Sequence, residues 1–251
     1  MNLSVLQKKP LLIKDPYPHV IIENALPDSI YDQLEREWPA QQLLATDPFD
    51  NGICYRLKSD EMLKPGVVSD LWKQFTAYHT SAEFYKEVKS IFNDYMPSVE
   101  DIDNTISPRG WDKGNDKIGS DCQTVMHQPI NFSSRTPHID NPREIYAGLL
   151  YMPYADCKST GGEFQIHETL SNVTEVNKNG GREVGDKAGK IVKSVPYRRN
   201  TLVMFCNNST QAVHSVSARK DAVKHRRSVN IIAEFNRVAK RSMFDVKELR
   251  K

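Results

Sequence analysis

The second half of this 251-residue chain is organised around the sequence Thr136-Pro137-His138-Ile139-Asp140-Asn141-Pro142. His138 and Asp140 are two residues apart, and alternate side chains of an extended strand point to the same face. The imidazole and the carboxylate are therefore predicted to lie side by side, where both can bind one metal ion. A third ligand then has to come from another strand.

His214 is the predicted third ligand. It begins an alternating segment, His214-Ser215-Val216, in which the residue types are typical of a strand. Two imidazoles and one carboxylate on one face of a metal, with the remaining positions open, form the facial triad of non-haem Fe(II) oxygenases. A His-x-Asp pair alone is common by chance, so the prediction depends on the motifs that accompany it.

A second group of polar residues comes from the last strongly predicted strand. Alternation puts Arg226, Ser228 and Asn230 on one face and the apolar residues of the strand, together with Arg227, on the other. A guanidinium that faces a protein interior needs an anion, and a carboxylate binds it in a bidentate geometry. A register slip of one residue would exchange Arg226 for Arg227. We favour Arg226, because that register keeps the apolar residues together.

Composition limits what these motifs can mean. With 39% hydrophobic and 26% charged residues, the chain suits one large β domain with helical decoration, or two small ones. A formal net charge of +2 gives no reason to expect nucleic acid, and no apolar run suggests a membrane span. The start of the chain lacks the features of a secretory signal, so a cytoplasmic location is expected. Four scattered cysteines are predicted to be free thiols.

The first 105 residues are predicted to be a largely helical support region. A strand is expected at 19–22, a helix at 27–38 and two helices between 68 and 95, because their apolar residues recur at the matching periods. Residues 41–66 contain several turn signals and are expected to cover a pocket.

Short strands separated by Gly, Pro, Asn and Ser are predicted in residues 106–237, which is typical of a sandwich or barrel. The expected strands are 122–128, 145–152, 162–167, 195–197, 202–205, 214–217 and 228–235. The polar segment 171–190 lacks apolar periodicity and is predicted to be a mobile loop. Residues 238–251 are predicted to form a C-terminal tail.

In this order, the motifs resemble the His-x-Asp, distal His and Arg-x-Ser motifs of the 2-oxoglutarate and Fe(II)-dependent oxygenases. Their prolyl-hydroxylase-like branch is the most similar, because its His-x-Asp-Asn-Pro segment also leads to a Tyr-containing strand and then to a Gly-Gly hairpin strand, here Gly161-Gly162. The resemblance covers roughly residues 120–236. It implies an α+β, mainly β fold, in which N-terminal helices flank a double-stranded β-helix (jelly roll) core, and a single oxygenase domain over 1–251.

The resemblance also assigns roles to single residues. The implied ligands of Fe(II) are His138, Asp140 and His214, with no catalytic residue beyond this metal centre. Arg226 and Ser228 would bind the distal carboxylate of 2-oxoglutarate, and Tyr151 is a candidate to share it. Gln128 stands where the branch often has a tyrosine and is a further candidate for cosubstrate binding. The remaining histidines of this half are expected at the pocket rim or surface: His127, His167 and His225.

The implied activity is that of a 2-oxoglutarate-dependent dioxygenase. Such an enzyme uses O2 to hydroxylate an unactivated C–H bond of a small molecule, amino acid or peptidyl side chain, while 2-oxoglutarate is decarboxylated to succinate and CO2. Ascorbate is an optional reductant. The expected partner is thus a small-molecule or peptidyl substrate, with no nucleic acid and no membrane.

Two other classes of function stay open at this point. One is a cupin-like metal-dependent jelly roll that binds or isomerises a sugar, in which the inward arginine would hold the substrate. The other is a non-catalytic structural β-sandwich, in which the three ligand residues are a coincidence. Binding of the metal and of the cosubstrate separates the three.

Overall fold

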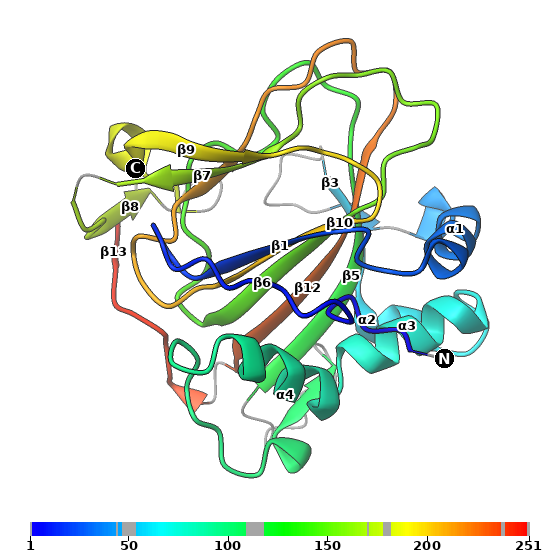
Figure 1. Ribbon diagram of the computed structural model, residues 1–251, viewed down its shortest axis with the longest axis horizontal. Helices are drawn as coiled ribbons and strands as arrows, with labels where there is room; N and C mark the ends of the chain where they lie inside the picture. Colours follow the sequence, from blue (N-terminus) through cyan, green and yellow to red (C-terminus); the bar gives the residue numbers. More distant parts are fainter. Residues whose placement is uncertain are drawn as a thin grey trace.

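Two β-sheets pack face to face in the computed structural model, and helices cover the outer face of the larger sheet (Figure 1). The structure describes residues 2–43, 45–46, 54–108, 118–169, 171–177, 182–236 and 239–249. The predicted fold class is confirmed, because the protein is mainly β, with two antiparallel sheets and with helices in its N-terminal part. Part of the segment predicted to cover a pocket, 44 and 47–53, lies outside the described residues.

The strands of the large sheet, in spatial order, are β1 (His19–Glu23), β10 (Thr201–Cys206), β6 (Glu144–Tyr151), β12 (Arg226–Phe235), β5 (Ile118–His127), β3 (Cys54–Leu57) and β2 (Ala45–Thr46). These pairs are antiparallel, and β4 (Ile106–Pro108) joins β5 in parallel. The small sheet contains β11 (His214–Val216), β7 (Phe164–Glu168) and β9 (Lys190–Val195). A separate parallel pair consists of β8 (Glu175–Asn177) and β13 (Lys247–Leu249).

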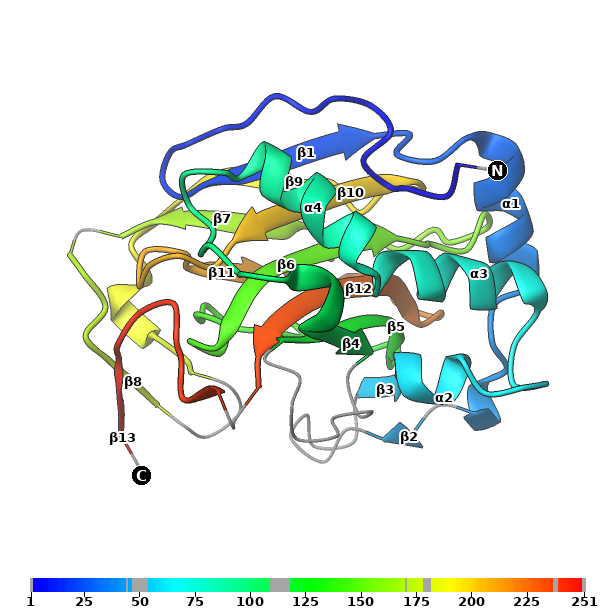
Figure 2. The ribbon, with the colours of Figure 1, turned by 90° about the horizontal axis from the view of Figure 1, so that it is seen from below.

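The helices lie mainly in the first part of the chain. They are α1 (Asp28–Arg36), α2 (Ser59–Met62), α3 (Asp70–His79) and α4 (Ala82–Ile91), with 3-10 turns η1 (Gln41–Leu43), η3 (Ile102–Asn104) and η4 (Gly185–Ala188). The predicted break between α3 and α4 has a local cause: the Ser69 and Ser81 hydroxyls accept hydrogen bonds from Trp72 N and Phe84 N, which caps each helix at its start. Both helices lie along the large sheet (Figure 2), and their buried apolar residues belong to the same core cluster as residues of that sheet.

Strand β12 separates two apolar clusters, as its alternation predicts. Its residues Val229, Ile231, Ala233 and Phe235 belong to the outer core, which includes residues from α3 and α4. The opposite face of the large sheet meets the small sheet in a second group, here called the inner cluster. Its buried members are Tyr17, Ala147, Tyr151, Phe164, Ile166, Val195, Val203, Phe205 and Ala212. Arg226 and Ser228 therefore face the space between the sheets.

Several segments differ from the sequence prediction. Besides the helices and the strand β1, which the sequence predicts at 19–22, the first 105 residues supply β2 and β3 to the large sheet. Near the C-terminus, β13 pairs with β8, so this part of the predicted tail is ordered by a strand contact. The expected mobile loop 171–190 has apolar anchors after all. Its buried residues Val173, Val176, Val184 and Ala188 pack with Ile139 and Val213, while residues 178–181 lie outside the described ranges.

Within the described ranges, every helix is too short or too polar to cross a bilayer. All four cysteines are free, as predicted, and they are Cys54, Cys122, Cys157 and Cys206.

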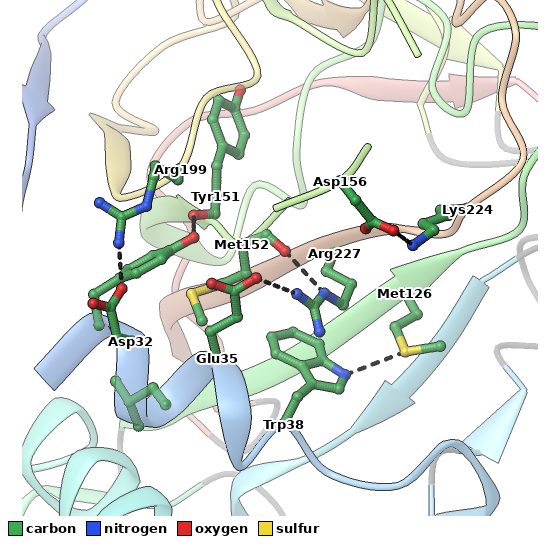
Figure 3. A network of polar contacts seen from close by, with 12 residues as sticks. Asp32, Glu35, Trp38, Met126, Tyr151, Met152, Asp156, Arg199, Lys224 and Arg227 are labelled. Carbon is green, nitrogen blue, oxygen red and sulfur yellow. Dashed lines mark hydrogen bonds and ion pairs between the residues drawn. The ribbon is translucent and has the colours of Figure 1, made fainter. Parts of the chain in front are cut away.

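Helix α1 is fastened to the large sheet by Arg227, the neighbour of the inward Arg226 (Figure 3). The Arg227 Nε donates to Met152 O at 2.9 Å, and Nη2 lies 3.2 Å from Glu35 Oε1. Its guanidinium carbon also lies 3.8 Å from the Tyr154 ring centroid and 4.9 Å from that of Trp38. Arg227 thus meets its own carboxylate on the outer side of the sheet, which is the register that we favoured from the sequence.

Burial of His79 predicts a defined loss of stability in acid. The His79 side chain is 0% exposed; its Nδ1 lies 2.8 Å from Phe75 O, and its Nε2 accepts from Val5 N at 3.3 Å. Burial lowers the pKa of His79 to about 3. Below pH 6.5 the unfolded chain therefore binds a proton that the folded chain does not, and the free energy of unfolding falls by about 1.4 kcal/mol per pH unit for this residue.

The variant His79→Gln should remove that contribution. The free energy of unfolding is measured by urea unfolding at pH 7.0 and at pH 4.5. Its decrease between the two pH values should be roughly 3 kcal/mol smaller for the variant than for the wild type. An equal fall in both proteins would contradict the assignment.

Candidate metal centre

The three predicted metal ligands come together between the two sheets. His138 and His214 form an antiparallel bridge, in which the backbone N of each donates to the backbone O of the other at 3.0 Å. Their ring centroids are 4.3 Å apart. Asp140 Oδ1 lies 3.6 Å from His138 Nε2, and Oδ2 lies 3.5 Å from His214 Nε2. One ligand atom from each residue lies within 4.8 Å of the other two, which is compact enough to hold one metal ion.

Each imidazole is oriented by a backbone carbonyl. His138 Nδ1 lies 2.7 Å from Thr136 O, and His214 Nδ1 lies 2.9 Å from Ala212 O. Because a carbonyl can only accept, Nδ1 carries the hydrogen and the Nε2 lone pair remains for a metal. Burial is the main reason why the pKa of both residues lies below that of a free histidine. The neutral imidazole is the form that binds a metal, so the site is prepared for one.

Aromatic packing holds His214 in place. The Phe164 ring stacks on it at 5.0 Å with an interplanar angle of 20°, and the Phe205 ring centroid lies 4.7 Å away. On the His138 side, Ile139 is buried in the cluster that the segment 171–190 supplies. The positions of the ligands are therefore fixed by packing on both sides of the bridge.

Arg226 lies in the same interior with a free hydrogen-bonding group. It is 1% exposed, its Nε donates to Gly162 O at 3.1 Å, and its Nη2 has no partner among the described residues. The buried Tyr151 hydroxyl also lacks a partner there, and the Arg226 guanidinium carbon lies 5.2 Å from the Tyr151 ring centroid. A buried cation without a counter-ion is costly. Together the two groups fit the carboxylate of a ligand.

The Gly-Gly motif has a physical reason in this structure. Gly161 has φ +79°, a backbone conformation that favours glycine. A Cβ at this position would lie 2.0 Å from Ala218 O, so any other residue would clash with that carbonyl. Gly162 has φ +80°, and its carbonyl receives the Arg226 Nε. The motif thus lets the β7 hairpin approach the turn before β12 and helps to orient Arg226.

The other predicted cosubstrate residues occupy different surroundings. Ser228 is the cross-strand neighbour of Tyr151, and its Oγ donates to Asn230 Oδ1 at 2.9 Å. Gln128 follows the end of β5, and its Nε2 donates to the Tyr55 hydroxyl at 2.9 Å. Its role in cosubstrate binding stays a prediction.

His127, rather than Gln128, is paired with Arg226 across β5 and β12. It is 7% exposed, and its Nδ1 has no partner among the described residues. Burial, followed by the positive charge of Arg226, holds its pKa well below the ordinary value. The expected rim or surface position is therefore wrong for His127. It is also wrong for His167, which is buried with its Nε2 2.8 Å from Ser215 Oγ.

Comparisons with known proteins agree with this geometry at the level of the fold. No family model matches the chain, and neither does any curated protein sequence. A prolyl hydroxylase from Trichoplax adhaerens, solved in complex with a hypoxia inducible factor peptide fragment, matches with a TM-score of 0.51 and 14% identity, over 88% of this chain and 86% of that chain.

Two further structures match over most of their length with slightly lower TM-scores. IDO from Bacillus thuringiensis has a TM-score of 0.49 and 12% identity, over 87% of this chain and 93% of that chain. The epimerase SnoN, in complex with Fe3+, alpha-ketoglutarate and nogalamycin RO, has a TM-score of 0.48 and 9% identity, over 86% and 78%.

The chain thus has the double-stranded β-helix fold that the sequence predicts and shares it with the Trichoplax adhaerens prolyl hydroxylase, so the predicted resemblance is confirmed for the fold. Within that fold it carries a candidate iron site of two histidines and one aspartate.

Removal of any one ligand should abolish tight metal binding. Each of His138→Ala, Asp140→Ala and His214→Ala leaves two ligand atoms, so isothermal titration with Fe(II) under anaerobic conditions should show no saturable site. Circular dichroism should report an intact fold. The control His225→Ala removes a half-buried histidine outside the triad and should bind the metal as the wild type does. Wild-type affinity in any triad variant would rule out that residue as a ligand.

Proposed function

We propose that the protein is a 2-oxoglutarate-dependent dioxygenase that hydroxylates an unactivated C–H bond of a small molecule, amino acid or peptidyl side chain. Fe(II), 2-oxoglutarate and O2 are the proposed cofactor and cosubstrates. The observation that carries the proposal is the presence, in one barrel interior, of a His-Asp-His triad and of a buried arginine without a carboxylate partner among the described residues. A metal and an anionic cosubstrate account for both.

The proposed roles follow from the contacts of each side chain. Fe(II), held by the triad, would supply the O2 chemistry that side chains cannot. Arg226 would bind the distal carboxylate of 2-oxoglutarate through Nη2, and the Tyr151 hydroxyl would donate a second hydrogen bond to it. Ser228 lies beside Tyr151 on the same face. His127, neutral because of burial and the nearby cations, would offer a further polar contact without adding charge.

The inner cluster contributes by its apolar character. Phe164 and Phe205 flank His214, and the remaining members line the space between the sheets. Fewer water molecules near the metal strengthen the charge interactions there and limit side reactions. These residues thus favour an oxidation that depends on a dry site.

The charge of Arg226 also bears on the alternative functions. In a structural β-sandwich, a buried guanidinium without a counter-ion would cost stability and serve no purpose. In a cupin-like sugar isomerase, Arg226 would instead contact the substrate. The two enzymatic functions differ in one measurable property, which is the binding of 2-oxoglutarate next to the metal.

The direct test is the addition of Fe(II) and 2-oxoglutarate to the protein without oxygen. A metal-to-ligand charge-transfer band in the visible range is expected if both bind at one centre. Oxygen and a panel of amino acids and prolyl peptides should then identify substrates by stimulated release of succinate. Fe(II) binding without the band would favour the cupin-like function, and no Fe(II) binding would refute both.

The two adjacent arginines provide a sharper prediction. Arg226→Gln removes one partner of a buried charged pair, which typically costs about 2 to 5 kcal/mol, or a factor of roughly 30 to several thousand in Kd for 2-oxoglutarate. Arg227→Gln disrupts the contact with Glu35 on the outer face and should lower Tm while Kd changes little. Titration of the charge-transfer band measures both constants, with Fe(II) affinity as an internal control. The reverse pattern would assign the cosubstrate contact to Arg227.

A further inference from the structure

The aspartate of the triad lacks the support that both histidines have. Each imidazole donates its Nδ1 hydrogen to a backbone carbonyl, Thr136 O or Ala212 O. In the described part of the chain, the close polar contacts of the Asp140 carboxylate are the two imidazole Nε2 atoms. Those nitrogens would turn to a bound metal, and so would one carboxylate oxygen. The other oxygen then needs a hydrogen-bond donor, because ligating carboxylates are themselves hydrogen-bonded.

A donor without a partner is buried close by, in the segment that precedes β1. Tyr17 is 1% exposed, and its hydroxyl makes no hydrogen bond to any described residue. Its ring belongs to the inner cluster and packs edge-on against Phe205, with 5.8 Å between centroids. Phe205 in turn contacts the ligand His214. Only one aromatic ring therefore lies between Tyr17 and a metal ligand.

The register of the large sheet directs Tyr17 inward. His19 pairs with Phe205, and Cys206 N donates to Pro18 O at 3.0 Å, so the ladder continues past the start of β1. Tyr17 precedes His19 by two residues and lies on the same face as Phe205. Burial, followed by the negative charge of Asp140, raises the pKa of Tyr17, so its hydroxyl keeps its hydrogen as a donor.

We propose that Tyr17 is a positioning residue of the metal centre, whose hydroxyl donates a hydrogen bond to the Asp140 oxygen that does not bind the metal. This inference rests on the proposed function, because it requires a metal at the triad. The hydrogen bond holds Asp140 as a ligand through one oxygen only, so that the open positions of the metal stay available. A residue from the N-terminal region thereby completes a site that the motifs place entirely after residue 120.

The test is the affinity for a metal, with Co(II) as an air-stable probe. Tyr17→Phe keeps the ring and removes only the hydroxyl. Loss of such a supporting hydrogen bond typically weakens metal binding by about 10- to 100-fold, and isothermal titration should show a Kd raised by that factor. The visible absorption of bound Co(II) should change as well, because its coordination is altered. Neither readout depends on turnover.

A matched control separates this role from a general effect of losing a buried hydroxyl. Tyr85 is 3% exposed, its hydroxyl also lacks a partner among the described residues, and it belongs to the outer core. Tyr85→Phe should leave the Kd for Co(II) unchanged. Without metal, Tyr17→Phe should unfold at the same Tm as the wild type or higher, because an unsatisfied buried hydroxyl stabilises nothing. The increase in Tm on saturation with Co(II) should be smaller for Tyr17→Phe than for the wild type.

Three results would count against the proposal. If wild type and Tyr17→Phe bind Co(II) equally, Tyr17 is not a positioning residue, while the proposed function stands. Equal weakening by Tyr17→Phe and Tyr85→Phe would likewise refute the specific contact with Asp140. If the wild type binds neither Co(II) nor Fe(II), the proposed function fails together with this inference.

Discussion

The site depends on the two-residue period of strand β12. Arg226 and Arg227 are adjacent in sequence, yet one faces the space between the sheets and the other faces helix α1. The register cannot slip at low cost, because β12 pairs with β5 over its whole length and with β6 over most of it. A shift by one residue would carry the apolar residues of the outer core into the site and leave Glu35 without its cation. Packing of the core thus fixes which arginine is available to a ligand.

The elements that the sequence predicts correctly are those with strong local patterns. Helices α3 and α4 and the alternation of β12 follow from periods of 3.6 or 2 residues. The triad is also predictable, although its first two residues lie outside the strands: His138 forms an isolated β-bridge with His214, Asp140 follows two residues later, and His214 begins β11. Segment 171–190 is different. The buried residues in its described part have no regular spacing, so only contact with Ile139 and Val213 reveals their role.

Residues whose role depends on strand pairing are the ones that the sequence does not reveal. His127 lies beside Arg226 because β5 pairs with β12 in a register that sets the two residues opposite each other, whereas Gln128, one position later, lies beyond this paired stretch. The position of Tyr17 is even harder to predict from the sequence, because its side chain reaches the inner cluster only when β1 pairs with β10. In both cases the local sequence resembles an ordinary strand end, and the long-range pairing gives the side chain its surroundings.

The balance of buried charges links the metal centre to Arg226. The triad histidines are held neutral by burial, and the positive charge of Arg135 contributes to the low pKa of His138. In the proposed enzyme, a divalent cation beside the single carboxylate of Asp140 would leave excess positive charge in a buried space that also contains Arg226. A dicarboxylate cosubstrate offsets that charge at both ends, at the metal and at the guanidinium. Metal and cosubstrate should therefore bind more tightly together than either binds alone, since each reduces the cost of burying the charge of the other.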